Sequence, residues 1–113
     1  MLRTLTLAGA ALLLAANTAS ADPLEGRWKT DSGAIAQIAG SGGGFTITLR
    51  SGAHNGKRIG QLNAVGNGKY KGTITDPAND KTYSGNATLK GDNLAMQGCV
   101  AAIFCRTQNW QRQ

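Results

Sequence analysis

Residues able to perform acid–base, nucleophilic or metal chemistry are few in this chain of 113 residues, which has a single histidine, His54, and two cysteines. A Ser-His-Asp set or a histidine metal cluster needs more such side chains than the sequence supplies. Asp76 and Asp80 are candidates for a carboxylate pair. The Asp-Pro-Ala-Asn-Asp run that holds them is typical of a turn, in which proline presets φ and Asx side chains bond nearby backbone. The sequence therefore predicts no catalytic site, no cofactor and no metal, and a small hydrolase is the least favoured hypothesis.

The two cysteines, Cys99 and Cys105, have the spacing C-x5-C instead of the C-x-x-C of redox motifs. Free buried thiols, a redox pair and a metal site are the alternatives, and His54 is the only histidine available as a further ligand. In an exported protein two cysteines permit one pairing. We predict a structural disulfide, which contributes only about 2 kcal/mol because the ring is small.

The N-terminus has the pattern of a secretory leader. Arg3 provides a positive charge, residues 5–16 are mostly apolar, and Ala19-Ser20-Ala21 has the small-x-small pattern of a cleavage site. The apolar run is shorter than the roughly 20 residues that a membrane span needs. We predict a signal peptide over residues 1–21, cleavage before Asp22, and an exported protein without a transmembrane span.

Residues 22–113 then form one domain of 92 residues. Without Arg3, eleven Lys and Arg oppose six Asp and Glu, a net charge of +5. Nucleic-acid-binding proteins cluster such charges and interleave them with aromatic residues. Here the cations are spread singly, apart from one pair at Lys57-Arg58, so the sequence predicts no nucleic-acid partner.

Short β-like runs fill the rest of the chain, and no stretch has helical apolar periodicity. The clearest is Phe45 to Arg50, in which Phe45, Ile47 and Leu49 alternate with polar residues. Eight such runs joined by short turns predict an all-β, small, eight-stranded antiparallel up-and-down β-barrel. The expected strands are 25–30, 34–39, 45–50, 57–65, 69–75, 81–90, 93–98 and 106–112, with a flexible glycine-rich loop at 40–44.

This strand order predicts which residues meet at each end of the barrel. Trp110 and Arg112 in the last strand should lie beside Trp28 in the first, and close one end by core packing and a cation–π contact. Loops 31–33, 51–55, 76–80 and 100–104 should surround the other end. An eight-stranded barrel either is filled by side chains or holds one small ligand, and small inward residues such as Ala34 and Gly72 fit both.

Candidate ligand-binding residues follow from strand parity. Arg106 and Gln108 share a parity with Trp110 and should point inward, where buried polar groups need partners. A polar or anionic ligand would satisfy them, as would hydrogen bonds to Tyr70 or Tyr83, and His54 lies in one of the loops at the same end. The loop 100–104 is entirely apolar, so its exposed candidates Val100, Ile103 and Phe104 either fold over the barrel or meet a partner.

Three blocks of sequence resemble the DUF2147 family of exported bacterial proteins. They are Gly72-x-Ile74-x-Asp76-Pro77 with Lys81-Thr82-Tyr83, then Leu94-x-Met96-x-Gly98-Cys99, and Cys105-Arg106-Thr107-Gln108-x-Trp110-x-Arg112. The opening Asp22-Pro23-x-x-Gly26-x-Trp28-x-Thr30 is similar to that of the family, and the family's longer middle segment is shortened here to residues 56–62. The resemblance implies a lipocalin-like barrel in the periplasm and a small-molecule-binding role, and it supplies no catalytic residues.

The leading hypothesis from the sequence is a periplasmic, non-catalytic carrier or sensor for a small amphipathic or hydrophobic ligand. The alternative is an envelope interaction module, an adaptor or inhibitor, that engages a protein partner through the apolar loop. We expect a monomer or weak dimer.

Overall fold

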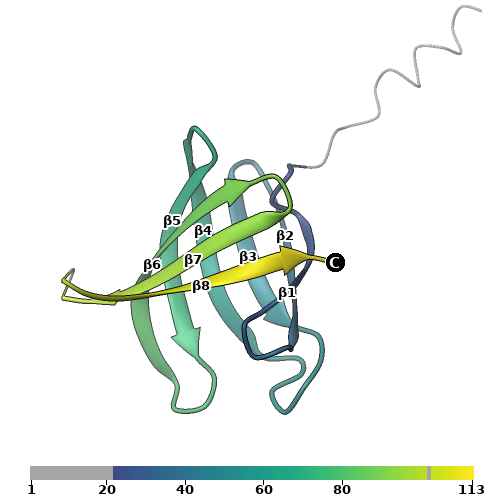
Figure 1. The fold of residues 1–113 in the computed structure, drawn as a ribbon, viewed down its shortest axis with the longest axis vertical. Coiled ribbons are helices and arrows are strands. Elements are labelled where there is room, and N and C mark those ends of the chain that lie inside the picture. The colour runs from purple at the N-terminus through teal and green to yellow at the C-terminus, as the bar shows by residue number, and fades with distance from the viewer. Residues whose placement is uncertain (1–21, 102) are drawn as a thin grey trace, which may run out of the picture.

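The protein is a closed eight-stranded β-barrel in which each strand pairs antiparallel with its neighbour in the sequence (Figure 1). The computed structural model describes residues 22–101 and 103–113, so the leader expected at residues 1–21 lies outside the described residues. The closed barrel of eight sequential antiparallel strands confirms the predicted all-β up-and-down architecture. The strands are β1 Gly26–Lys29, β2 Ile35–Ser41, β3 Gly44–Leu49, β4 Arg58–Gly66, β5 Lys69–Asp76, β6 Lys81–Lys90, β7 Asn93–Val100 and β8 Phe104–Arg112. No helix of the described chain is long and apolar enough to span a membrane.

The barrel core is formed by alternate residues of the strands. Burial in β3 follows the sequence pattern, with Phe45, Ile47 and Leu49 buried between half-buried neighbours. Because successive side chains of a strand point to opposite faces, one face of each strand supplies the core and the other meets water. The remaining buried core residues are Leu24, Trp28, Ala36, Ile38, Ile59, Leu62, Tyr70, Ala87, Leu94, Met96 and Trp110.

The strand β4, whose alternation is poor in the sequence, has irregular pairing on both sides. Its register shifts against β3 between Ile47 and Thr48, and against β5 between Ala64 and Gly66. Ile59 and Gly60 are consecutive and both buried. A β-bulge places two residues of one strand opposite one residue of its partner and so breaks the period of two.

Two predicted loops are shorter than expected. The prediction of a flexible loop at 40–44 is wrong, because β2 continues to Ser41 and only Gly42 and Gly43 form the turn. Both have positive φ, 67° and 87°, as a tight hairpin turn requires of its two central residues. The apolar loop at 100–104 is also shorter, because Val100 pairs with Phe104 at the end of the β7–β8 hairpin.

Closure of the barrel depends on a short contact between its first and last strands. Only two residue pairs join them, Trp28 with Arg112 and Lys29 with Gln111. The strand β8 pairs with β7 along its whole length, from Val100–Phe104 to Asn93–Gln111. Residues 104–110 of β8 therefore pair with β7 alone, while the backbone N–H of Gln113 adds one hydrogen bond to the carbonyl oxygen of Arg27 at 2.9 Å.

Candidate functional site: the barrel cavity

The end of the barrel near the C-terminus, which we call the closed end, is sealed by the segment before β1. Leu24 is fully buried there, and its carbonyl oxygen accepts a hydrogen bond from the indole Nε1 of Trp28 at 3.0 Å. The guanidinium of Arg112 lies over the same indole, 4.3 Å from the ring centroid. It also donates to the carbonyl oxygen of Pro23 at 2.7 Å and to a carboxylate oxygen of Asp92 at 3.0 Å.

Tyr70 also lies at the closed end, away from the residues that line the cavity described below. Its hydroxyl donates to the carboxylate of Asp22 at 3.1 Å, and its ring packs edge to face on Phe45. Burial, the hydrogen bond to Asp22 and the negative charge of that carboxylate all raise the pKa of Tyr70 above its ordinary value. The expectation that Tyr70 serves a ligand therefore finds no support in its position.

The other half of the barrel opens to solvent through a cavity of about 1220 Å³, which is bounded in part by the exposed residues Ile103 and Phe104. Its apolar lining comes from residues deep in the strands, among them Leu49, Ile59, Ile74, Met96 and Trp110. Residues from the turns 31–33, 51–55, 76–80 and the β7–β8 connection complete the lining, and we call this end the mouth. The sequence left open whether the barrel is filled, and the structure answers that the closed half is packed and the mouth half is hollow.

The cavity residues that the sequence singled out as ligand-binding candidates lie on β6, on β8 and in the 51–55 loop. They are Arg106, Gln108, Tyr83 and His54. Gln108 accepts a hydrogen bond through Oε1 from the indole Nε1 of Trp110 at 2.9 Å. This contact replaces the expected hydrogen bonds between Gln108 and a tyrosine. The side chain of Arg106 has no hydrogen bond or ion pair to any residue that the structure describes.

A glycine makes the space next to Arg106. Gly98 of β7 is the residue paired with Arg106, and it also pairs with Gly85 of β6. A Cβ atom at Gly98 would lie 3.1 Å from Ile74 Cγ2 and 3.7 Å from Tyr83 Cβ. A side chain at Gly98 would therefore crowd Ile74 and make an ordinary contact with Tyr83, and both of these residues line the cavity.

Both carboxylates of the 76–80 turn have partners. Asp76, which lines the cavity, accepts a hydrogen bond from the backbone N–H of Ala78 at 2.9 Å. Asp80 forms an ion pair with Lys57, whose Nζ also reaches the carbonyl oxygen of Pro77 at 3.4 Å. These contacts hold the 76–80 turn together, as its sequence predicts. Within the described residues, no group of three or more His, Cys, Asp or Glu side chains is placed to hold a metal ion.

The β7–β8 hairpin projects from one side of the barrel (Figure 1). Cys99 and Cys105 are directly opposite each other in it and are joined by the predicted disulfide. Beyond the disulfide lie Val100, Ile103 and Phe104, which we call the hairpin tip. Ile103 and Phe104 are 74% and 70% exposed. The interpretation of this segment as a lid folded over the barrel is therefore wrong, although the tip contributes to the rim of the cavity.

Several lining residues escaped the sequence analysis. Trp110 was assigned to core packing and closure, and Met96 was given no ligand role, yet both line the cavity. Both side chains lie on the inner face that Arg106 and Gln108 also share, and strand alternation could therefore have predicted that they line the cavity. Ile59 gave no such signal, because the bulge in β4 hides its orientation.

Comparison with known proteins gives one family. The family described as an uncharacterized protein conserved in bacteria (DUF2147) matches residues 48–112. This range contains all of β4 to β8, most of the cavity lining and both cysteines. A search of curated proteins and a search of solved structures each found no match.

Proposed function

Because the chain belongs to the DUF2147 family, whose description assigns no activity, we propose from the cavity that it is an exported, periplasmic, lipocalin-like protein that binds one small amphipathic ligand. The observation that supports this role is the hollow half of the barrel. Ligand sites are typically concave, mostly apolar and lined by a few polar groups that orient the ligand. The cavity has an apolar interior, with Arg106, Gln108 and Tyr83 among its polar lining residues.

Export is supported by the leader pattern of residues 1–21 and by the disulfide, since disulfides persist in oxidising compartments. We favour binding over catalysis because Ser51, His54 and Asp76 line the cavity without a hydrogen bond that joins their side chains among the described residues. Ser51 Oγ instead accepts from the backbone N–H of Ile35 at 2.7 Å, and Asp76 accepts from that of Ala78 at 2.9 Å.

The test is titration with N-phenyl-1-naphthylamine, a neutral probe whose fluorescence rises in apolar surroundings. The protein is expressed from the full chain and purified with its disulfide intact. We expect saturable binding of one probe per chain. Gln108→Trp places an indole in the cavity and should abolish binding. Thr107→Trp, one residue away on the outer face of β8, is the matched control and should bind as the wild type does. Unsaturable fluorescence, or equal binding by both variants, would refute the proposal.

A second candidate function, an envelope interaction module, is favoured by the exposure of the hairpin tip. Crosslinking in intact envelopes, followed by mass spectrometry, tests it with the variant Ile103→Ser/Phe104→Ser. A discrete crosslinked partner that the folded variant loses would support this function, and an identical crosslinking pattern would exclude it.

A further inference from the structure

Three polar side chains of the cavity, Arg106, Gln108 and Tyr83, have hydrogen-bond donors without a partner among the described residues. The guanidinium of Arg106 carries only donors. The indole N–H of Trp110 can only donate, so the atom of Gln108 that faces it is the amide oxygen, at 2.9 Å. The NH₂ group of Gln108 is then free to donate, and within the described chain it donates to no other residue. The hydroxyl of Tyr83 likewise has no partner among the described residues.

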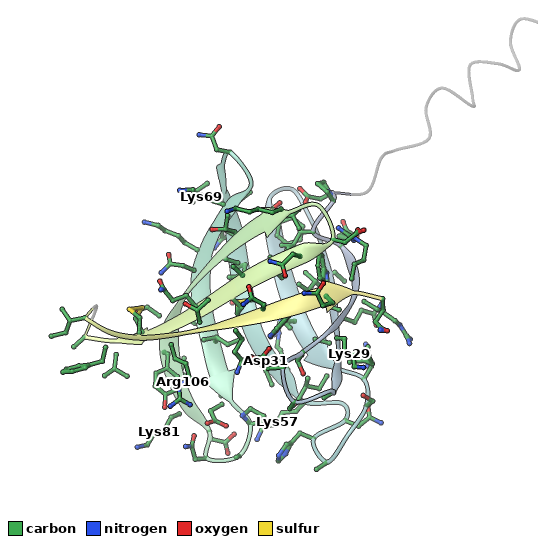
Figure 2. All side chains as sticks on the ribbon, in the orientation of Figure 1. Lys29, Asp31, Lys57, Lys69, Lys81 and Arg106 are labelled. Carbon is green, nitrogen blue, oxygen red and sulfur yellow. A yellow bond between two sulfur atoms is a disulfide. The ribbon has the colours of Figure 1, made fainter. Side chains whose placement is uncertain are left out.

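These donors lie on β6 and β8, the two strands that flank β7. Arg106 and Gln108 are two residues apart on the same face of β8, and they pair with Gly98 and Met96 of β7. Tyr83 is beside Gly98, because a Cβ atom at that glycine would lie 3.7 Å from the tyrosine Cβ. Figure 2 shows Arg106 projecting from β8 on the side of the molecule where Lys57 and Lys81 also lie.

One acidic residue, Asp76, is among those that line the cavity. It accepts the hydrogen bond of Ala78 within its own turn. The positive charge of Arg106 therefore has no bonded counter-ion among the described residues, and it remains exposed to solvent at the mouth.

The interior beyond the donors is apolar. Met96 is paired with Gln108, Trp110 follows Gln108 toward the closed end, and Leu49, Ile59 and Ile74 line the cavity from other strands. A ligand that complements both the hydrogen-bond donors and the apolar interior has an oxyanion at one end and a hydrocarbon chain at the other. We propose that the ligand is an anionic amphiphile, whose carboxylate or phosphate head is bound by Arg106, Gln108 and Tyr83 and whose alkyl chain lies against Met96 and Trp110.

This assignment rests on the proposed function, and it is tested separately from it by competition. Decanoate, decyl phosphate and decanol share a chain length and differ in the head, and each is titrated against bound N-phenyl-1-naphthylamine at neutral pH and constant ionic strength. We expect decanoate or decyl phosphate to displace the probe at a concentration at least about tenfold lower than decanol, the effect of a charge-assisted hydrogen bond. Whichever of the two displaces more strongly identifies the head.

Two variants assign the effect to Arg106. In Arg106→Gln the ratio between the decanol and decanoate concentrations should fall toward one. Lys81→Gln removes a positive charge on the same side of the molecule from a residue that does not line the cavity, and it should keep the wild-type ratio. Far-UV circular dichroism verifies that both variants are folded.

Each result bears on one claim. Equal displacement by all three compounds in the wild type would refute the proposal of an anionic head group. An equal loss of discrimination between decanoate and decanol in both variants would refute it as well. In either case probe binding would still support the cavity as a binding site. If acetate or inorganic phosphate displaces the probe at the same concentration as the alkyl compounds, the claim that the ligand needs an alkyl chain is refuted. Absence of probe binding would instead refute the proposed function itself.

Discussion

Arg112 closes the barrel, and its replacement tests how the closed end is stabilised. Only two residue pairs join β1 and β8, and Arg112 is in one of them. Its guanidinium connects the segment before β1, through the carbonyl oxygens of Pro23 at 2.7 Å and Glu25 at 3.5 Å, to the turn after β6, through Gly91 at 3.4 Å. Arg112→Met retains most of the side-chain volume and removes these contacts.

The expected loss of stability follows from these contacts. A hydrogen bond to a charged group contributes about 1.5–3 kcal/mol. Only the bond from Arg112 to the carbonyl oxygen of Pro23 is short, and the bonds to Glu25 and Gly91 are long, so we count one such contribution. The cation–π contact with Trp28 adds about 0.5–2 kcal/mol. The ion pair with Asp92 adds little, because that carboxylate is 84% exposed. We expect Arg112→Met to lower the free energy of unfolding by about 2–4 kcal/mol, which is roughly 10–25 °C in Tm for a domain of this size.

Urea denaturation monitored by tryptophan fluorescence measures this loss. Arg112→Lys keeps the charge without the planar fork of donors, so it should recover only part of the stability. Asp92→Asn should cost less than about 1 kcal/mol. A loss below about 1 kcal/mol in Arg112→Met, or an equal loss in Asp92→Asn, would refute the view that the carbonyl bonds and the indole contact hold this end.

Two further predictions concern the disulfide and Tyr70. Replacing both Cys99 and Cys105 by alanine should lower the free energy of unfolding by about 2 kcal/mol, because the bridge closes a short loop. Reductant should destabilise the wild type equally and leave the variant unchanged, and a variant as stable as the wild type would contradict this. The folded state raises the pKa of Tyr70 and so favours its protonated form. Its stabilising effect is complete below the unfolded pKa of about 10 and is lost as pH rises toward the folded value. Denaturation between pH 8 and 11 should show this fall in the wild type and a smaller one in Tyr70→Phe, whereas parallel curves would refute it.

The sequence alone was sufficient for the architecture. Alternation in Phe45 to Leu49 and turn residues such as Asp76-Pro77 repeat along the chain, and eight such strands can remove their exposed edges only by closing. The same parity places Arg106 and Gln108 on the inner face, and it predicts that Arg112 meets Trp28. The pairing of the two cysteines was also predicted from the sequence, because two cysteines allow one disulfide only.

Only the tertiary structure decided how the interior is divided. The register of the strands determines which inward side chains pack together. The bulges of β4 change that register, and the residue pattern of β4 does not show where they occur. Tyr70 and Tyr83 look equivalent in the sequence, yet one bonds Asp22 at the closed end and the other lines the cavity. The exposure of Ile103 and Phe104 is likewise a tertiary property, because a hairpin of any composition can extend beyond the barrel once strand pairing continues past its rim. Local sequence therefore determines the strands and their faces, whereas the volume that they enclose depends on contacts between residues distant in the chain.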